Sequence, residues 1–478
     1  MHSTFVREQK RYTITNLCDK LKCSEDTLIP IIRKLKEYGV LKAVKFNEQQ
    51  KDMSDLANAD IEVADVDVGD NEYLYVFTYV GIVIVSGYVL KCYPKYIRSK
   101  DEPKDELCQV LKVLEKYNTK EQIIKIFNDT SESSSFNLLA VLLFLIRDYY
   151  ENGVYNNTED IIETNGPGEI LWDKTINETF TYLSNNRPFY PELLTKKRVN
   201  NETDYFKRLH ECILTKASRE MKNADLLELF ETTEIELTDE EFDDFGDKEY
   251  ILYRIEKELN NQFNTRKQLV LKTIYAYIDN TNNLNETDCV SMFGTNSFNL
   301  VWEKVCADIL DNKLKCPLKD LHLPSGNVNT SFNTNDLLID LIEKPYWSIT
   351  GKESADTLIP DLIAINGSQF LIFDAKYYTP KLEPNQKPEQ QPGIESITKQ
   401  YLYQLAYKDF IKVHEFTDIK NCFLMPTEEG YVLNKGTVTM KMFRDLELSD
   451  IEVRYIPATI AFCYYLSDTI MNISELNL

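Results

Sequence analysis

Three charged side chains that could act together on a substrate lie in an otherwise apolar stretch near the C-terminal end of the chain: Asp361, Asp374 and Lys376. Burying these charges is costly unless they pair with one another or bind a metal ion. Carboxylate oxygens suit Mg²⁺, which usually binds through one or two carboxylates together with water and substrate phosphate. A neighbouring lysine can orient or deprotonate an attacking water and offset the charge that builds on a phosphate. The three residues therefore predict metal-dependent hydrolysis of a phosphodiester bond.

A β-hairpin would bring these side chains together. In the segment PDLIAINGSQFLIFDAKYY, two apolar runs flank Asn366-Gly367, a dipeptide suited to a two-residue type I′ turn. Asp361 begins the first run. Asp374 and Lys376, on the second run, are two residues apart and therefore project from the same face of a strand. We expect the three charges to converge within a buried sheet.

Further elements are expected around this hairpin. The pattern predicts an amphipathic helix before it, a flexible Pro-, Lys- and Gln-rich loop after it, then a helix, two more strands and a packing helix. Their ranges are 298–310, 380–392, 394–411, 421–426, 451–456 and 458–466. This order of elements predicts an α/β core.

The motif of Pro360-Asp361 followed by Asp374-Ala375-Lys376 resembles the PD-(D/E)XK nuclease motif. The wider context, SADTLIPDLIAI followed by FLIFDAKYY, is similar to the LlaJI family of restriction endonucleases, which are relatives of the McrC nuclease subunit. The resemblance spans most of the chain and includes the NGPGEILWD segment at 165–173, to which no chemistry is assigned. It implies a Mg²⁺-dependent endonuclease that cuts double-stranded DNA in a restriction, or antiviral defence, system.

The resemblance also implies roles for particular residues. Asp361 and Asp374 would bind Mg²⁺, and Lys376 would position the attacking water. PD-(D/E)XK folds commonly place an acidic residue on a helix before the strands, which here is Glu303, a further metal ligand and catalytic aid. Related nucleases use a Gln followed by a Tyr on the helix after the hairpin to orient the site. Gln404 is the candidate, and the tyrosine after it comes at a spacing of three rather than four.

A partner protein is expected because the chain has no nucleotide-binding loop of the form G-x-x-x-x-G-K-[ST]. The nearest match, Gly351-Lys352-Glu353, lacks both the spaced glycine and the hydroxyl residue. McrC-like nucleases work with a separate AAA+ GTPase, so the resemblance implies an McrB-like partner in trans. Residues 73–96 and the middle helices could be its docking surface. Cleavage of both DNA strands also requires two nuclease domains to approach each other, so self-association is expected.

An N-terminal helix pair at residues 12–42 suggests an alternative function. Ser24 is expected to cap its second helix, and Pro30 would kink that helix or delay its start. Residues 40–42 would begin a wing. Such a helix-turn-helix could read DNA with its second helix, or it could serve protein contacts. In the alternative, the chain is a non-catalytic DNA-binding or regulatory protein, and the nuclease fold is its scaffold.

A chain of 478 residues exceeds one typical core, so several domains are expected. Its content of 43% hydrophobic and 27% charged residues is ordinary for a globular protein. The predicted fold class is α+β multidomain. Strand-like residues 73–96 predict a meander or small barrel, and Lys95 at their end is expected to be solvated. The predicted division is a winged-helix-like unit at 1–46, a linker at 47–71, an McrC-like β-rich region at 72–120, a helical middle at 121–285 and a PD-(D/E)XK nuclease domain at 286–478.

The charge of the chain is unevenly distributed. The net charge is −23, which counts against nonspecific DNA binding by the whole surface. Residues 1–45 hold ten Lys/Arg and five Asp/Glu, a net of +5. Residues 228–249 hold eleven acids and one lysine, a net of −10, and are expected to be a solvated face or a disordered loop, with partner docking as an alternative.

Cysteine usage and the N-terminus favour a cytoplasmic protein. Ten cysteines and four scattered histidines form no pattern typical of zinc binding or of a disulfide scaffold. The N-terminus has no apolar region typical of a signal peptide. The longest apolar run, Leu138 to Ile146, is too short to span a bilayer, so no membrane association is expected.

Overall fold

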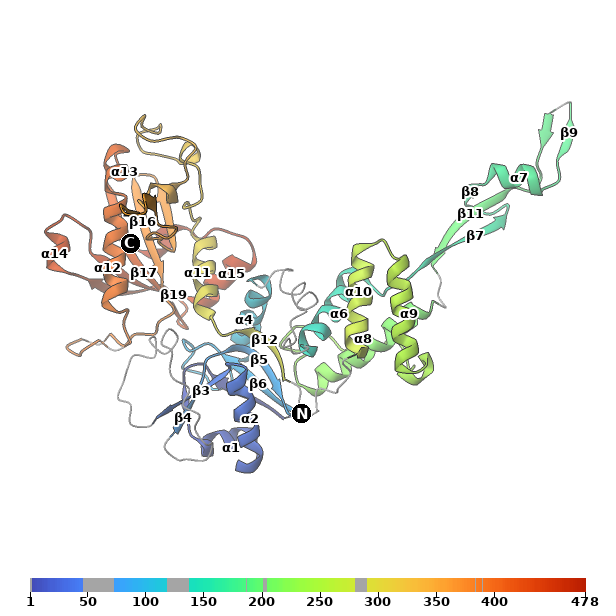
Figure 1. The fold of residues 1–478 in the computed structure, drawn as a ribbon, viewed down its shortest axis with the longest axis horizontal. Coiled ribbons are helices and arrows are strands. Elements are labelled where there is room, and N and C mark those ends of the chain that lie inside the picture. Colours follow the sequence, from blue (N-terminus) through green and yellow to red (C-terminus); the bar gives the residue numbers. More distant parts are fainter. Residues whose placement is uncertain are drawn as a thin grey trace. The chain divides into compact units, whose positions relative to one another are not determined.

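The computed structural model describes residues 2–45, 73–117, 137–185, 187–200, 204–279, 290–382, 384–388 and 390–478. The chain is a mixed α/β protein that divides into two compact units (Figure 1). Unit 1 comprises Met1–Ser134, Leu229–Glu231 and Thr287–Leu478, and unit 2 comprises Ser135–Glu228 and Thr232–Glu286. The N-terminal region and the C-terminal core thus belong to one unit. The predicted linker at 47–71 lies outside the described residues.

The expected N-terminal helix pair is present in unit 1. Ser24 is the N-cap of α2 (Glu25–Glu37), and Pro30 lies within this helix without ending it. α1 (Ile14–Leu21) precedes it, and β3 (Leu41–Lys45) follows it. β4 (Tyr73–Phe77) pairs with both β3 and β2 (Arg11–Tyr12). The apolar side chains at helical spacing in the two helices are buried: Ile14, Leu17, Leu21, Leu28, Ile31, Ile32 and Leu35.

A four-stranded sheet in the order β1-β6-β5-β12 combines segments that are distant in the sequence. Its strands are β1 (His2–Arg7), β5 (Val80–Val85), β6 (Tyr88–Tyr93) and β12 (Val290–Thr295). Gly81 lies opposite Gly294, and a Cβ on Gly81 would lie 2.1 Å from the carbonyl oxygen of Phe293. The prediction of one meander or barrel for residues 73–96 was wrong, because these strands are divided between two sheets.

A five-stranded sheet in the order β15-β16-β17-β19-β18 forms the C-terminal part of unit 1. β16, β17 and β19 are parallel, whereas β15 and β18 pair antiparallel at the edges. α12 covers one face of the sheet, and α11 and α15 cover the other (Figure 1). The bounds are α11 (Phe298–Ile309), β15 (Leu362–Asn366), β16 (Gln369–Ala375), α12 (Ile394–Ala406), β17 (Asp418–Thr427), β18 (Leu433–Val438), β19 (Ile451–Pro457) and α15 (Ala458–Leu466).

The β15–β16 hairpin turns one residue later than predicted. Asn366 pairs with Gln369, so the two loop residues are Gly367 and Ser368. Gly367 has a φ of +59°, and Ser368 is not among the residues with positive φ. A positive φ at the first loop residue alone is the pattern of a type II′ turn, so the predicted type I′ turn was wrong.

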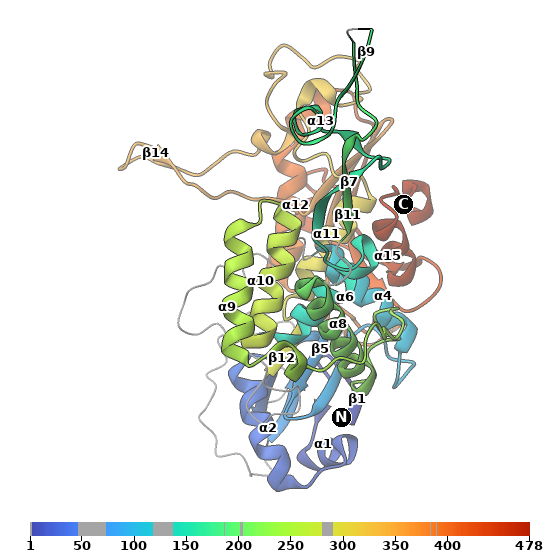
Figure 2. The ribbon, with the colours of Figure 1, turned by 90° about the vertical axis from the view of Figure 1, so that its right-hand side faces the viewer.

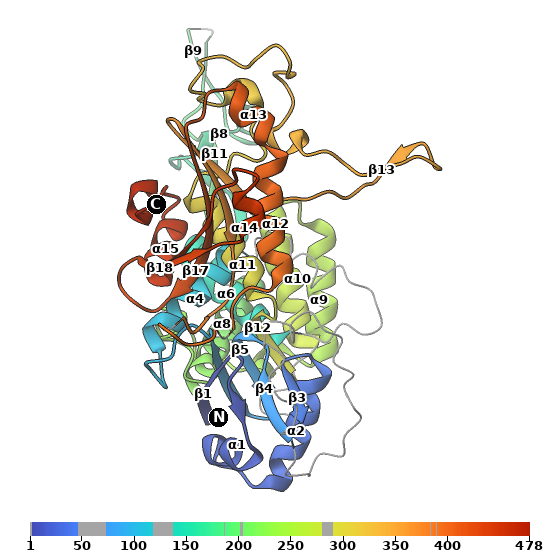
Figure 3. The same ribbon diagram turned by 90° about the vertical axis from the view of Figure 1, so that its left-hand side faces the viewer.

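A second hairpin precedes β15 in the chain. β13 (Tyr346–Trp347) and β14 (Lys352–Glu353) pair antiparallel. This hairpin projects away from the sheet of unit 1 (Figures 2 and 3). Tyr346 and Trp347 are exposed on it.

Unit 2 contains the expected helices and also strands that the sequence analysis did not predict. The helices are α6 (Leu138–Asn152), α7 (Trp172–Glu178), α8 (Tyr205–Asn223), α9 (Lys248–Asn261) and α10 (Thr265–Asp279). The strands are β7 (Thr158–Thr164), β8 (Glu169–Ile170), β9 (Tyr182–Ser184), β10 (Arg187–Phe189) and β11 (Leu194–Asn200). Within the described part of the chain, no helix is long and apolar enough to cross a membrane.

The acidic segment at 228–249 is ordered against α8. Arg208 on that helix donates to both carboxylate oxygens of Glu240. Lys222 pairs with Glu234 at 2.5 Å. Most of the segment remains exposed, which agrees with a solvated face, whereas a disordered loop was the wrong alternative. Its charge is therefore partly neutralised within the chain.

Candidate active site

Asp361 and Asp374 lie opposite each other across the hairpin. The last pair of the ladder is Leu362 with Phe373, and the residues next along the two strands are Asp361 and Asp374. The two carboxyl groups are close enough for Asp374 to raise the pKa of Asp361. The Asp361 carboxylate also accepts a hydrogen bond from the Ala375 N–H at 2.8 Å. The predicted turn would have set Asp361 opposite Ile372, so the position of the turn decides how closely the two carboxylates approach.

Lys376 lies beside this pair. Its ammonium nitrogen is 3.0 Å from Asp374 Oδ2, and the two side chains are 22% and 5% exposed. Its backbone N–H donates to the Leu424 carbonyl at 2.9 Å, which continues the pairing of β16 with β17. The indole N–H of Trp302, on α11, donates to the same carbonyl at 3.1 Å. The lysine is therefore fixed through both its backbone and its ion pair.

These charges alter one another's protonation. The pKa of Asp361 is raised, first by burial and then by the opposing Asp374 carboxylate, while Lys376 acts to lower it. Burial also raises the pKa of Glu303, whose charged form is favoured by Lys376 and disfavoured by Asp374. The pKa of Lys376 is raised, because the carboxylates outweigh burial, which lowers it. The cluster thus holds a lysine beside two carboxyl groups, of which Asp361 keeps its proton to higher pH, since burial and Asp374 raise its pKa to about 9.

The paired carboxylates are the groups best placed to hold a metal ion. Within the described residues, no three Asp, Glu, His or Cys side chains come together as a metal-binding group. Two facing carboxylates nevertheless match the hard oxygen donors that Mg²⁺ takes before water and phosphate complete its shell. Asp361 and Asp374 fit this donor set. Glu303, on α11, is close enough for Lys376 and Asp374 to affect its pKa, but it does not form one metal-binding group with the two aspartates. Its role as a ligand stays a prediction.

Gln404 is buried on α12, where its amide bonds to other parts of the core. Its Oε1 accepts hydrogen bonds from Asn421 Nδ2 at 2.7 Å and from the Ser449 N–H at 3.0 Å. The neighbouring Tyr403 is influenced by the site, because its pKa is raised by burial and then by the Asp374 and Asp361 carboxylates. The predicted catalytic role of Gln404 stays a prediction.

Asn312, which the sequence analysis missed, anchors the start of β15. Its Nδ2 donates to the Asp361 carbonyl at 3.1 Å, and its Oδ1 accepts from the Ile363 N–H at 3.1 Å. Because Asn312 follows α11, these bonds connect that helix to the strand that presents Asp361. A single asparagine after a helix carries no sequence signal that distinguishes it from a turn residue.

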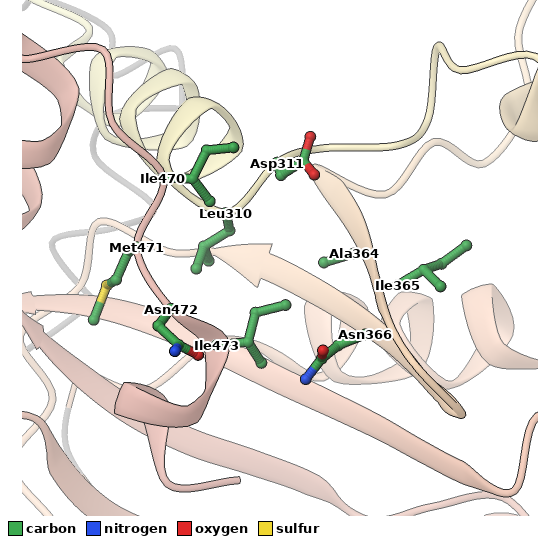
Figure 4. A pocket seen from close by; sticks show the side chains of 9 residues that line it. All are labelled: Leu310, Asp311, Ala364, Ile365, Asn366, Ile470, Met471, Asn472 and Ile473. Carbon is green, nitrogen blue, oxygen red and sulfur yellow. The ribbon is translucent and has the colours of Figure 1, made fainter. Parts of the chain in front are cut away.

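A pocket in the same unit does not contain these residues. It is lined by residues 310–311, 364–366 and 470–473 (Figure 4). None of the three residues of the carboxylate and lysine cluster contributes to it. The candidate site is instead formed at the carboxyl end of β16, where the edge strand β15 begins.

Comparisons with known proteins identify the family to which this chain belongs. Residues 79–462 match the family described as LlaJI restriction endonuclease, and the chain belongs to that family. It is therefore a restriction-system nuclease by family, as the resemblance of the hairpin motif had indicated.

One curated protein and two solved structures are similar to this chain. The type II restriction enzyme BsuMI component YdjA of Bacillus subtilis (strain 168) is 26% identical over 427 residues, which cover 84% of this chain and 83% of that protein. Two similar solved structures come from Thermococcus gammatolerans. One is a chain of the refined half-complex from the tetradecameric assembly of McrB AAA+ hexamers with bound McrC. It is 12% identical, the match covers 98% of this chain and 99% of that chain, and the TM-score is 0.39. The other is a chain of the McrBC complex, with 14% identity, coverage of 63% and 85%, and a TM-score of 0.26.

Proposed function

We propose that this chain is the Mg²⁺-dependent endonuclease of a restriction system and hydrolyses phosphodiester bonds in double-stranded DNA. The observation that carries the proposal is the pair of carboxylates, Asp361 and Asp374, opposed across a buried hairpin beside Lys376. Like charges placed directly opposite each other destabilise a sheet, and a divalent cation would turn that repulsion into attraction. The family of the chain supports the same activity.

Each residue of the site has a proposed task. Asp361 and Asp374 would hold the metal ion, and Glu303 would assist from α11. Lys376 would orient the attacking water and offset the negative charge that develops on the phosphate. A bound Mg²⁺ supplies Lewis-acid polarisation of the phosphate and lowers the pKa of a bound water. Gln404 would orient the site from α12. We assign the nuclease core, residues 286–478, to the PD-(D/E)XK type.

We further propose that cleavage depends on a separate AAA+ GTPase of the McrB type, in the cytoplasm, and that two nuclease domains associate to cut both strands. The side chains of β5 and β6 are mostly buried, so these strands offer little docking surface. Large apolar side chains are exposed instead on the β9–β10 hairpin and beside it, and such side chains mark interaction surfaces. They are Trp172, Phe180, Tyr182, Leu183 and Phe189.

Plasmid cleavage tests this function. Methylated and unmethylated plasmids are incubated with the chain and Mg²⁺, with and without GTP and the products of neighbouring genes. We expect Mg²⁺-dependent cleavage that Asp374→Ala abolishes and Asp356→Ala, at an exposed carboxylate nearby, preserves. Full cleavage by a folded Asp374→Ala protein would overturn the proposal. Efficient cleavage by the chain alone would exclude the dependence on a GTPase.

The same experiment addresses the alternative function. α1 and α2 form the helix pair that a DNA-binding protein would use. Binding to DNA under all metal and nucleotide conditions, with no cleavage in any of them, would favour a non-catalytic DNA-binding protein over a nuclease.

A further inference from the structure

Tyr377, the residue after Lys376, contacts two residues that follow strands of the β1-β6-β5-β12 sheet, called here the N-terminal sheet. It is 6% exposed, and its hydroxyl donates a hydrogen bond to Glu8 Oε2. The Lys95 N–H donates to the same hydroxyl at 3.2 Å and to Glu8 Oε2 at 3.1 Å. The Lys95 ammonium lies 4.4 Å from the centroid of the Tyr377 ring and donates to Gln9 Oε1 at 3.1 Å. The expectation that Lys95 is a solvated strand end was therefore wrong.

The parallel pairing of β1 and β6 delivers Glu8 and Lys95 to one place. Glu8 follows the end of β1, and Lys95 comes two residues after the end of β6, so both lie at the carboxyl edge of that sheet. Glu8 is 6% exposed. A buried carboxylate is destabilising unless its oxygens have partners, and the partners here are the Tyr377 hydroxyl and the Lys95 N–H.

Tyr377 also contacts the helix that supports the nuclease site. The ring of Phe298, on α11, lies 5.1 Å from the Tyr377 ring. The same helix carries Trp302, whose indole shares the Leu424 carbonyl with the Lys376 N–H. Tyr377 therefore lies between the N-terminal sheet and the elements that fix Lys376.

We propose that Glu8 and Lys95 are positioning residues for the nuclease site. By fixing Tyr377 they hold the adjacent Lys376 against Asp374, so the N-terminal sheet completes the site. This inference rests on the nuclease function proposed above. A displacement of a reacting group by about 1 Å can lower a rate about 10²-fold, so a restraint one residue from the ammonium is sufficient to affect the chemical step.

Cleavage kinetics of four variants test this role. Glu8→Ala removes the acceptor, and Tyr377→Phe removes the hydroxyl but keeps the ring. We expect both to lower kcat, Glu8→Ala by about 10-fold to 10²-fold, with little change in KM for DNA. Glu8→Gln retains an acceptor and should restore most of kcat. The matched control is Glu428→Ala, because Glu428 accepts hydrogen bonds from the Arg98 and Ser99 N–H groups at the same junction without contacting Tyr377.

Equal losses in Glu8→Ala and Glu428→Ala would overturn the proposal, because they would show that only the packing of the junction matters. Melting temperatures of all four variants identify any that fail to fold. If Glu8→Ala alone fails to fold, Tyr377→Phe and Glu8→Gln decide the outcome, and unchanged kcat in Tyr377→Phe would overturn the role.

A second readout does not require cleavage, so failure of the nuclease function can be told apart from failure of this inference. The reactivity of the Lys376 amine toward an acylating reagent is measured by mass spectrometry relative to Lys304, which is more exposed. We expect several-fold faster labelling of Lys376 in Glu8→Ala and Tyr377→Phe, and wild-type labelling in Glu8→Gln and Glu428→Ala. Unchanged labelling in folded Glu8→Ala would overturn the inference even if the wild-type protein does not cut DNA.

Discussion

Replacing Asp361 by Asn is expected to stabilise the metal-free protein while abolishing its response to Mg²⁺. Asn keeps the shape of the side chain and an oxygen that can accept the Ala375 N–H, as Asp361 does now at 2.8 Å. It removes the ionisable carboxyl group next to Asp374. The substitution therefore separates the electrostatic cost of the carboxylate pair from its structural contacts.

The magnitude follows from the register. A second negative charge about 5 Å from Asp374 would cost about 3 kcal/mol at an effective dielectric constant of about 20, and the folded chain avoids part of this cost at neutral pH by keeping a proton on Asp361. Lys376, at 3.0 Å from Asp374, offsets part of this repulsion. We therefore expect Asp361→Asn to raise the free energy of unfolding by about 1–2 kcal/mol at neutral pH without metal, or the melting temperature by about 2–4 °C.

The pH dependence has a definite sign. The pKa of Asp361 is raised in the folded protein by burial and by Asp374, so the folded chain binds this proton more tightly than the unfolded chain does. The metal-free wild-type protein should therefore lose stability as pH rises from the ordinary pKa of an aspartate through the raised value. The Asp361→Asn protein should lack this loss, and the two proteins should converge in stability at acidic pH.

Thermal unfolding in a chelating buffer and in a Mg²⁺ series measures both effects. Wild-type protein should gain about 2.7 kcal/mol when Mg²⁺ reaches about 100 times its Kd, whereas Asp361→Asn should gain much less. Asp356→Asn, at an exposed carboxylate, is the control and should behave as wild type. A metal-free Asp361→Asn protein that is less stable than wild type at neutral pH would refute the repulsion. An undiminished response to Mg²⁺ would refute the metal site.

Three further predictions concern buried polar groups. Lys376→Gln should abolish cleavage. It should also destabilise unit 1 by about 3 kcal/mol, because it leaves the buried Asp374 charge without its cation. A variant as stable as the wild type in urea unfolding would contradict this. Gln404→Ala should cost about 1–3 kcal/mol in urea unfolding by leaving buried partners unbonded, and a fall in cleavage per folded molecule would support its predicted catalytic role. Burial lowers the pKa of His210 from its ordinary 6.5 to about 4, so the folded state disfavours the proton. Unit 2 should therefore lose about 3 kcal/mol as pH falls from 6.5 through 4, and a His210→Gln protein with the same pH profile would contradict this.

The sequence alone does not determine which two residues form the turn between β15 and β16. The run Asn366-Gly367-Ser368 contains two overlapping dipeptides suited to tight turns, and local propensity does not choose between them. The choice depends on how β15 and β16 register with their surroundings. Asn312 holds one end of β15 through the Asp361 carbonyl, and the pairing of β16 with β17 sets the other strand.

Contacts between residues far apart in the sequence also could not be predicted from local patterns. The sequence predicted a solvated Lys95 because its partners Glu8 and Tyr377 are far from it in the sequence. Likewise, β12 at residues 290–295 pairs with β5 at residues 80–85, a contact that no local pattern indicates. Domain boundaries predicted from local composition divide the chain into consecutive segments. A compact unit, in contrast, is formed by strands and helices that pair even when they are far apart in the sequence.

The sequence by itself predicted the charged hairpin at the centre of the candidate site. Two carboxylates and a lysine in apolar runs with turn residues between the runs predict a buried charged hairpin. This prediction needs only neighbouring residues, because the alternation of side chains along a strand and the turn propensity are set locally. The helix pair at the N-terminus follows from the same periodicity. Only the tertiary structure decided that Asp361 lies next to Asp374, that Gln404 bonds within the core, and that Glu8 reaches Tyr377. These features depend on register and on contacts between distant segments, which arise from the packing of the whole unit.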